Sequence, residues 1–230
     1  MPTFYLAEGF NENSLITLSG KEAWHALAVR RLNVGDPIRL IDGKGNVAWA
    51  SVENQQGRNT ASIRVGDVSY FLPQVPSIIL ATAVAKGDRQ TIMLDMATQL
   101  GISAWQPLLC QRSVSKVGKN STDRWRRICL EACKQSGSAW LPELLPAAKP
   151  EDVAREACAR GREVLLAHPD GELNTVSPVD KLLLVGPEGG FTDEEVNKII
   201  AAGAKKINLG KNILRIETAA VSLLAQLRAG

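Results

Sequence analysis

The chain is poor in the residues that build metal centres and disulfide frameworks. Its 230 residues include two histidines and four cysteines, and no two cysteines have the CxxC spacing. Tetrahedral zinc sites need His and Cys ligands at short, fixed spacings, so the sequence excludes a structural zinc site. No metal is expected. The four cysteines are expected to be reduced thiols, and Cys129 and Cys133, one helical turn apart, are expected to pack in a core.

Long apolar runs and a targeting segment are also lacking. No apolar run reaches the ~18 residues that a membrane-spanning helix needs. The first residues, "MPTFYLAEGFNENS", lack the basic start and the apolar core of a signal peptide. Hydrophobic residues make up 45% of the chain, enough to bury the core of one large domain or two smaller ones. We therefore expect a soluble, cytoplasmic protein.

Positive charge is modest overall, at +3, but it is concentrated in one stretch. Between Arg112 and Lys134 seven basic residues stand against two acidic ones, and two of the seven are Lys116 and Lys119. Such a stretch favours a polyanion as partner. The alternative is a solvated helix face. Trp125, among three arginines, is expected either to stack on a base or to anchor an amphipathic helix.

The first part of the chain contains short runs of β-formers divided by turn signals. The runs "SLITLSG", "PIRLIDGKGNVAWASV" and "TASIRVGDVSY" predict strands, and the middle run predicts a hairpin with its turn at residues 42–46. One helix is predicted over residues 21–32. Pro73 and Pro76 then interrupt the pattern. We expect a small β-barrel-like domain over residues 1–72 and a second domain over residues 73–230.

In the second part, apolar strands alternate with helices, which predicts a mainly parallel sheet covered on both faces. The helix over residues 192–203 shows a capping box, with Thr192 at its start and Glu195 three residues later, and Gly203 as its end. Strands are predicted over residues 77–85, 103–110, 163–168, 181–186 and 205–210. Further helices are predicted over residues 88–101, 122–136, 150–160 and 217–230.

Three loops follow strands of this sheet, at the end where such sheets bind ligands. They are "AHPDG" (167–171), "GPEGG" (186–190) and "LGKNILRIETA" (209–219). Glycines allow the backbone to approach a ligand closely, but the negative charge of Glu188 argues against a phosphate. The positive sulfonium of S-adenosylmethionine fits this pattern better than a nucleoside triphosphate. Ordinary strand-to-helix turns are the alternative reading of the same glycines.

The motifs "LLLVGPEGGFTDEE" and "INLGKNILRIETAA", in this order, resemble the C-terminal signature of the RsmE family. Its members are N3-uridine methyltransferases of 16S rRNA in the SPOUT superfamily. The segments "AVRRLNVGDPIRLIDGKG" and "KGDRQTIMLDMATQLGISAWQPLLCQRS" extend the resemblance over nearly the whole chain. It implies an α/β protein with an N-terminal PUA-like β-barrel domain for RNA binding, followed by a SPOUT methyltransferase domain with a C-terminal trefoil knot. It also implies a homodimer that binds S-adenosylmethionine and acts on 16S rRNA in the assembled or nearly assembled small subunit.

Candidate site residues follow from the loops and the resemblance together. Arg215 and Glu217 flank Ile216 at the mouth of the glycine-lined pocket and are the catalytic candidates, with a structural Arg–Glu ion pair as the alternative. Arg215 is expected to stabilise charge on the uracil oxygens, and solvent or an unidentified group to take the N3 proton. The expected cofactor-binding residues are Ala167, His168, Gly186, Glu188, Gly190, Leu209, Gly210, Ile213, Leu214 and Thr218. The expected RNA-binding residues are Arg30, Arg31, Arg89, Arg112, Arg124, Arg126 and Gln135.

Two positions depart from the family pattern. Gln99 stands where the family usually has glutamate, and Ser138 stands where it usually has arginine. Both changes remove a charge that could engage the substrate. A noncatalytic RNA-binding homologue, or a methyltransferase of the same fold acting on another RNA, therefore stays open as an alternative.

Overall fold

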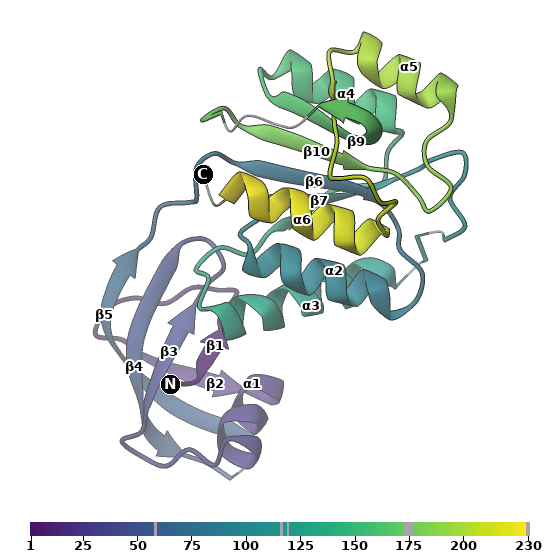
Figure 1. Cartoon of the computed structure of the whole chain (residues 1–230). Coiled ribbons are helices and arrows are strands. Elements are labelled where there is room, and N and C mark those ends of the chain that lie inside the picture. The colour runs from purple at the N-terminus through teal and green to yellow at the C-terminus, as the bar shows by residue number, and fades with distance from the viewer. Residues whose placement is uncertain (58, 116, 119, 173–176, 229–230) are drawn as a thin grey trace. The chain divides into compact units, whose positions relative to one another are not determined.

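A computed structural model describes the chain except for residues 58, 116, 119, 173–176 and 229–230. Its internal contacts divide the chain into two compact units. The first comprises Met1–Pro73 together with Leu130–Leu141, and the second comprises Gln74–Cys129 together with Pro142–Gly230 (Figure 1). The functional division at residue 72 stays a prediction.

The first unit is built on a curled five-stranded sheet with the order β1-β3-β4-β5-β2. β1 pairs in parallel with β3, and the other pairs are antiparallel. This is the PUA-like architecture that the resemblance implies. Buried side chains such as Phe4, Ile38 and Ile63 fill its interior. The strands are β1 (Thr3–Tyr5), β2 (Leu15–Ser19), β3 (Pro37–Ile41), β4 (Asn46–Gln55) and β5 (Thr60–Tyr70).

The predicted hairpin between β3 and β4 is confirmed, and Asp42 fixes its turn. The Asp42 carboxylate accepts hydrogen bonds from the backbone N–H groups of Lys44 (2.7 Å) and Asn46 (3.1 Å). Gly43 and Gly45 adopt positive φ within the turn, which costs glycine little. The three-residue strand β1 was not predicted, because so short a run carries no readable periodicity.

The helix predicted over residues 21–32 ends earlier than predicted, and it changes from an α-helix to a π-helix along its length. α1 (Gly20–Trp24) passes directly into a π-helix, η1 (His25–Val29), where the Arg30 N–H donates to the His25 carbonyl five residues back. Arg31 then adopts a φ of 56°, a left-handed conformation in which a helix cannot continue. The predicted end at residue 32 is therefore wrong by three residues.

Residues 130–141 pack with the first unit, although they lie far along the chain. The Arg39 guanidinium donates to the Gly137 carbonyl (2.9 Å), and the Trp140 indole N–H donates to the Phe71 carbonyl (2.9 Å). Lys134 forms an ion pair with Glu22 at 3.0 Å. No local pattern in the sequence indicates these contacts.

The second unit contains a six-stranded sheet with the order β11-β9-β10-β6-β7-β8, in which each neighbouring pair is parallel. The predicted parallel sheet is thus confirmed. The two-residue strand β8 was not predicted. The strands are β6 (Ile78–Ala83), β7 (Ala104–Leu108), β8 (Glu143–Leu144), β9 (Glu163–Glu172), β10 (Lys181–Val185) and β11 (Lys205–Ile207).

Helices cover the middle of this sheet. α4 packs on β9 and β10, α6 packs on β10 and β6, and α2 lies beside α6 (Figure 1). All five residues of β10 are buried, as expected for a strand enclosed on both faces. The helices after β6 are α2 (Asp88–Gln99), α3 (Ser121–Ser136), α4 (Pro150–Ala159), α5 (Asp193–Ala201) and α6 (Ile216–Arg228). The part of α3 from Leu130 onward belongs to the first unit.

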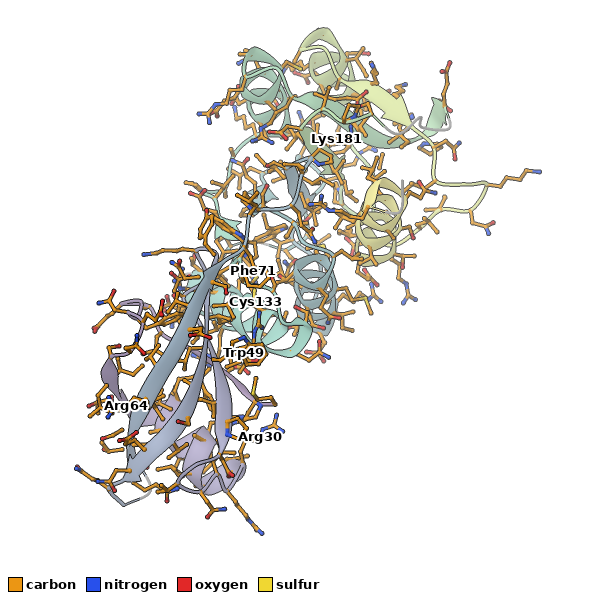
Figure 2. The ribbon with its side chains drawn as sticks, turned by 90° about the vertical axis from the view of Figure 1, so that its left-hand side faces the viewer. Arg30, Trp49, Arg64, Phe71, Cys133 and Lys181 are labelled. Carbon is orange, nitrogen blue, oxygen red and sulfur yellow. The ribbon has the colours of Figure 1, made fainter. Side chains whose placement is uncertain are left out.

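A buried ion pair joins the amino ends of β9 and β10. The fully buried Lys181 (Figure 2) donates to Glu163 (2.8 Å) and to the Ser177 hydroxyl (2.7 Å). Burial alone would raise the pKa of the Glu163 carboxyl. Hydrogen bonds from Lys181, Ser177 and Lys205 outweigh it and bring the pKa to about 2. The pair therefore stabilises the fold at the edge opposite the candidate site described below.

We predict that Glu163→Gln lowers the free energy of unfolding by about 3 kcal/mol at neutral pH, because Lys181 loses its buried counter-charge. Because the pKa of Glu163 is lower in the folded protein than its ordinary value of 4.5, its carboxylate contributes fully to the free energy of unfolding above pH 4.5. This contribution is lost as the pH falls towards about 2. Urea unfolding should thus show that the difference in free energy of unfolding between wild type and variant decreases as the pH falls through this range.

The control is Glu156→Gln, which breaks an exposed pair with Arg160. It should change stability by less than about 0.5 kcal/mol. If the loss of free energy of unfolding in Glu163→Gln did not change with pH, the stabilising role of the Glu163–Lys181 ion pair would be contradicted.

Candidate active site

The parallel sheet brings the three predicted segments to one edge. β9, β10 and β11 run in the same direction, so their carboxyl ends meet there. Residues 186–191 follow β10, residues 208–215 follow β11, and residues 167–171 lie near the end of β9. Residues 84–87 follow β6 at the same edge and lead into α2.

The segment 167–171 is part of β9 rather than the free loop predicted after residue 168. β11 pairs Lys206 with Leu166 and then Ile207 with Glu172, so the residues between Leu166 and Glu172 bulge out of the ladder. A Cβ on Gly171 would lie 2.3 Å from the backbone carbon of Ile207, a distance no side chain tolerates. Gly171 is thus required for close approach of the two strands.

Asn208 ties the end of β11 to this bulge. Its backbone N–H donates to the Glu172 carbonyl (3.0 Å), and its side-chain amide donates to the Pro169 carbonyl. Its side-chain oxygen accepts from the Gly210 N–H (2.6 Å), where Gly210 has a φ of 120°. The loop beyond leaves Ile213 92% exposed. An apolar side chain so exposed beside a glycine turn is available to cover a ligand.

The loop after β10 is folded by its own glycines. The Gly190 N–H donates to the Pro187 carbonyl (2.8 Å), with Gly190 at a φ of 69°. A Cβ on Gly186 would lie 2.9 Å from the Phe191 ring, so glycine allows that ring to pack against the strand end. These residues leave backbone groups, rather than large side chains, at the edge of the sheet.

The predicted capping box of α5 is confirmed. The Glu195 N–H donates to the Thr192 hydroxyl (3.2 Å), and the Thr192 N–H donates to the buried Glu195 carboxylate (2.8 Å). The other Glu195 oxygen accepts from the Gln111 N–H (2.8 Å), a long-range contact that the sequence did not reveal. The neighbouring Arg112 donates to the Gly189 carbonyl (2.9 Å) and lies along this loop.

Arg89 stands between two carboxylates of the site. Its guanidinium lies 4.0 Å from Glu188 and 3.8 Å from Glu217. The Glu217 side chain is only 15% exposed, and its second oxygen is buried with no hydrogen-bond partner among the described residues. The cation nearest Glu217 is therefore Arg89. The alternative of an Arg215–Glu217 ion pair is wrong, and Arg215 is exposed without an ion pair in the described part of the chain.

Gln90 is a buried polar residue at this edge that the sequence reasoning missed. Its side-chain oxygen accepts from the Ala85 N–H (2.9 Å), which shapes the turn after β6. Its side-chain nitrogen is buried and finds no partner within the described ranges. Buried polar atoms are usually paired, so Gln90 and Glu217 both mark places where a polar ligand group could complete a hydrogen bond.

Histidine 168 lies in the β9 bulge as a neutral ring. Its Nδ1 accepts from the Asp170 N–H (3.2 Å). Partial burial, with a smaller effect of Lys206, lowers the pKa of His168, so the ring is uncharged at neutral pH. The adjacent Ala167 is half-buried, as are Leu209 and Leu214.

The expected RNA-binding residues divide between the two units. Arg30 (Figure 2), Arg31 and Gln135 are exposed in the first unit, where Trp24 is also 52% exposed. The remaining four belong to the second unit, and all are half-buried or exposed: Arg89, Arg112, Arg124 and Arg126. Lys116 and Lys119 of the basic stretch lie outside the described residues.

Trp125 is a core residue. It is buried and packs edge-to-face on Trp105, with ring centroids 4.8 Å apart. The alternative that it stacks on a base is therefore wrong.

Cys129 and Cys133 are likewise buried, as predicted. Burial, reinforced by the charge of Glu195, raises the pKa of the Cys110 thiol to about 12, so it is not a nucleophile at neutral pH.

The two departures from the family pattern make local hydrogen bonds. The Gln99 amide donates to Asp95 (2.8 Å) on the same helix. The Ser138 hydroxyl donates to the Trp140 carbonyl (3.0 Å) and accepts from its N–H (3.2 Å).

The described ranges contain no group of three or more His, Cys, Asp or Glu side chains that could hold a metal. In the same ranges, no helix is long and apolar enough to cross a membrane.

Comparison with known proteins matches both parts of the chain. A family model described as an RNA methyltransferase domain matches residues 73–228, and one described as an RNA methyltransferase PUA domain matches residues 18–65. The ribosomal RNA small subunit methyltransferase E of Synechocystis is 34% identical over 224 residues, covering 93% of this chain and 73% of the relative.

Two solved structures match the chain over nearly its full length. The ribosomal RNA small subunit methyltransferase E of Neisseria gonorrhoeae, bound to S-adenosyl methionine, is 27% identical with a TM-score of 0.90, covering 100% of this chain and 97% of the other. A Legionella pneumophila protein assigned as a methyltransferase, in complex with the bound cofactor SAM, is 30% identical with a TM-score of 0.90. That match covers 99% and 96% of the two chains.

We predict that Gly171→Ala lowers the free energy of unfolding by about 2 kcal/mol, because the added methyl group forces β9 and β11 apart. The control is Gly189→Ala, whose Cβ would meet Arg112 at an ordinary 3.5 Å. It should change stability by no more than about 0.5 kcal/mol. Equal stability of the two variants in denaturant unfolding would show that β9 and β11 do not need this close approach.

Proposed function

This chain belongs to the RsmE family of RNA methyltransferases, and from this premise we propose that it transfers a methyl group from S-adenosylmethionine to RNA of the small ribosomal subunit. The acceptor that we propose is N3 of a uridine in 16S rRNA. The observation that carries the proposal is the family match across the chain, together with a glycine-lined edge flanked by carboxylates.

The cofactor site that we propose is the edge formed by β9, β10 and β11. S-adenosylmethionine supplies an electrophilic methyl group on a positively charged sulfur. Glycine turns let backbone groups approach such a ligand, and the Glu188 and Glu217 carboxylates favour a cation over a phosphate. Both Neisseria and Legionella relatives were solved with this ligand, which supports the assignment. The residues proposed to hold it are Ala167, His168, Gly186, Glu188, Gly190, Leu209, Gly210, Ile213, Leu214 and Thr218.

Arg215 is the residue that we propose to act on the base. Uracil N3 carries a proton engaged in base pairing, so the target must be unpaired or flipped out before reaction. Its deprotonation places negative charge on the carbonyl oxygens, which a positioned guanidinium stabilises. Arg215 is exposed and forms no ion pair in the described part of the chain, so its donors are available. Glu217, held near Arg89, completes the proposed catalytic pair.

RNA binding is proposed for arginines of both units and for Gln135 of the first unit. Exposed arginines attract the phosphate backbone regardless of sequence, and base contacts provide specificity. We propose Arg30, Arg31, Arg89, Arg124, Arg126 and Gln135 for these contacts. The proposed substrate is 16S rRNA in the assembled or nearly assembled subunit. The proposed state is a cytoplasmic homodimer with the knotted C-terminal topology of its superfamily.

Incubation with methyl-labelled S-adenosylmethionine and 30S subunits from a strain lacking the modification tests this function. Digestion of the RNA to nucleosides should place the label in N3-methyluridine, and subunits that already carry the modification should take up none. Label in a different nucleoside would overturn the N3 assignment. Label only in another RNA would identify a different substrate, and no label at all would favour the noncatalytic RNA-binding alternative.

We predict that Arg215→Ala slows methyl transfer by about 10² to 10³, as loss of one preorganised donor commonly does. Affinity for S-adenosylmethionine should change little, because the proposed contact is with the base. Lys211→Ala, which removes another exposed cation from the same loop, is the matched control and should keep its rate. A variant with weakened cofactor binding but a normal single-turnover rate at saturation would exclude the catalytic role of Arg215.

A further inference from the structure

Arg112 binds the backbone of the loop after β10 from outside. It follows β7, and its Nη1 donates to the carbonyls of Gly189 (2.9 Å) and Phe191 (3.3 Å). Its aliphatic part also lies against Gly189, since a Cβ added there would be 3.5 Å from the Arg112 Cδ. One side chain thus holds two peptide groups of a distant loop, Gly189 within the loop and Phe191 at its end, 77 and 79 residues away in sequence.

The neighbouring residues fix only the downstream end of that loop. The Gln111 N–H donates to Glu195, whose other oxygen closes the capping box at the start of α5. Upstream, β10 holds the chain as far as Val185. Between these fixed ends lie Gly186, Gly189 and Gly190, which have no side chains to restrict the backbone, and one hydrogen bond within the loop, from the Gly190 N–H to the Pro187 carbonyl (2.8 Å). The contacts of Arg112 therefore restrain the part of the loop with the greatest conformational freedom.

We propose that Arg112 is a positioning residue that holds the loop over residues 186–191 in the conformation that binds S-adenosylmethionine. This inference rests on the proposed function and deepens it. It replaces the role in RNA binding that the sequence predicts for Arg112. The planar guanidinium holds the two Nη1 N–H groups in fixed directions, and Nη1 lies one bond further from Cα than the ammonium of lysine, so lysine does not reproduce this pair of hydrogen bonds.

Loss of Arg112 is expected to weaken the affinity for S-adenosylmethionine. Without Arg112 the loop samples several conformations, and only a fraction of molecules presents the binding-competent one. The apparent Kd rises in inverse proportion to that fraction, so a fall to about one tenth weakens binding about tenfold. Once the cofactor is bound, the loop is ordered and the chemical step is unaffected.

The test compares Arg112→Lys and Arg112→Ala with wild type. We expect the Kd of S-adenosylmethionine, measured by calorimetry, to rise about tenfold in both variants. The KM for the cofactor should rise in parallel, while kcat at saturating cofactor stays within about twofold. The dependence of RNA affinity on salt should not change, because no phosphate contact is lost.

A phosphate-binding role for Arg112 predicts the reverse pattern. Arg112→Lys would then resemble wild type in all measurements, and Arg112→Ala would lose about 0.7 to 0.9 from the salt slope with normal cofactor affinity. A purely structural role would lower the melting temperature and the active fraction, hence the apparent kcat, without changing KM. Either pattern would overturn the proposal.

Arg155→Ala is the matched control. This exposed arginine on α4 forms an ion pair with Asp152 of the same helix (3.0 Å). Its loss should leave cofactor affinity unchanged. A wild-type protein that binds no S-adenosylmethionine would overturn the proposed function and this inference with it. Wild-type binding that both Arg112 variants reproduce would overturn the inference alone.

Discussion

Parallel pairing of β10 with both β6 and β9 is the constraint on which the candidate site depends. Parallel strands require crossover connections, and α4 lies in the one that leads from β8 to β9. α4 and the C-terminal helix α6 both pack on β10, which is completely buried. Because all the strands run the same way, every loop that follows a strand emerges at one edge. The buried Lys181–Glu163 pair holds the amino ends together at the other. Stability and ligand binding are thus assigned to opposite edges of the same sheet.

The proposed binding edge is built from backbone, and side chains from other segments hold that backbone in place. Glycines let chains approach closely, at the cost of conformational freedom that the folded loop must overcome. Asn208, Glu195 and Arg112 supply the compensating hydrogen bonds, each to peptide groups of a neighbouring segment. The Glu188 and Glu217 carboxylates both lie within 4.0 Å of Arg89 at this edge. These two carboxylates favour a cationic ligand with polar groups over a phosphate.

Local features were predictable from the sequence, and long-range contacts were not. The capping box at Thr192 and the turn at Asp42 depend on residues within a few positions, so their patterns are readable in the chain. The bulge in β9 depends on how closely Gly171 approaches β11, which no local pattern encodes. The same holds for the partner of Glu217, which proved to be Arg89 rather than the nearby Arg215, and for the contacts of Arg112. Resemblance to a family indicated the fold and the loops, but the hydrogen bonds that shape those loops required the structure.

The central claim is that one edge of the parallel sheet binds S-adenosylmethionine, and amide hydrogen exchange with and without this ligand tests it most directly. Bound ligand should slow exchange in three segments that are far apart in sequence: residues 167–171, 186–191 and 208–215. Exchange in the strands of the first unit should stay unchanged. Protection confined to other parts of the chain, or saturation with ligand without protection of these three segments, would contradict the account.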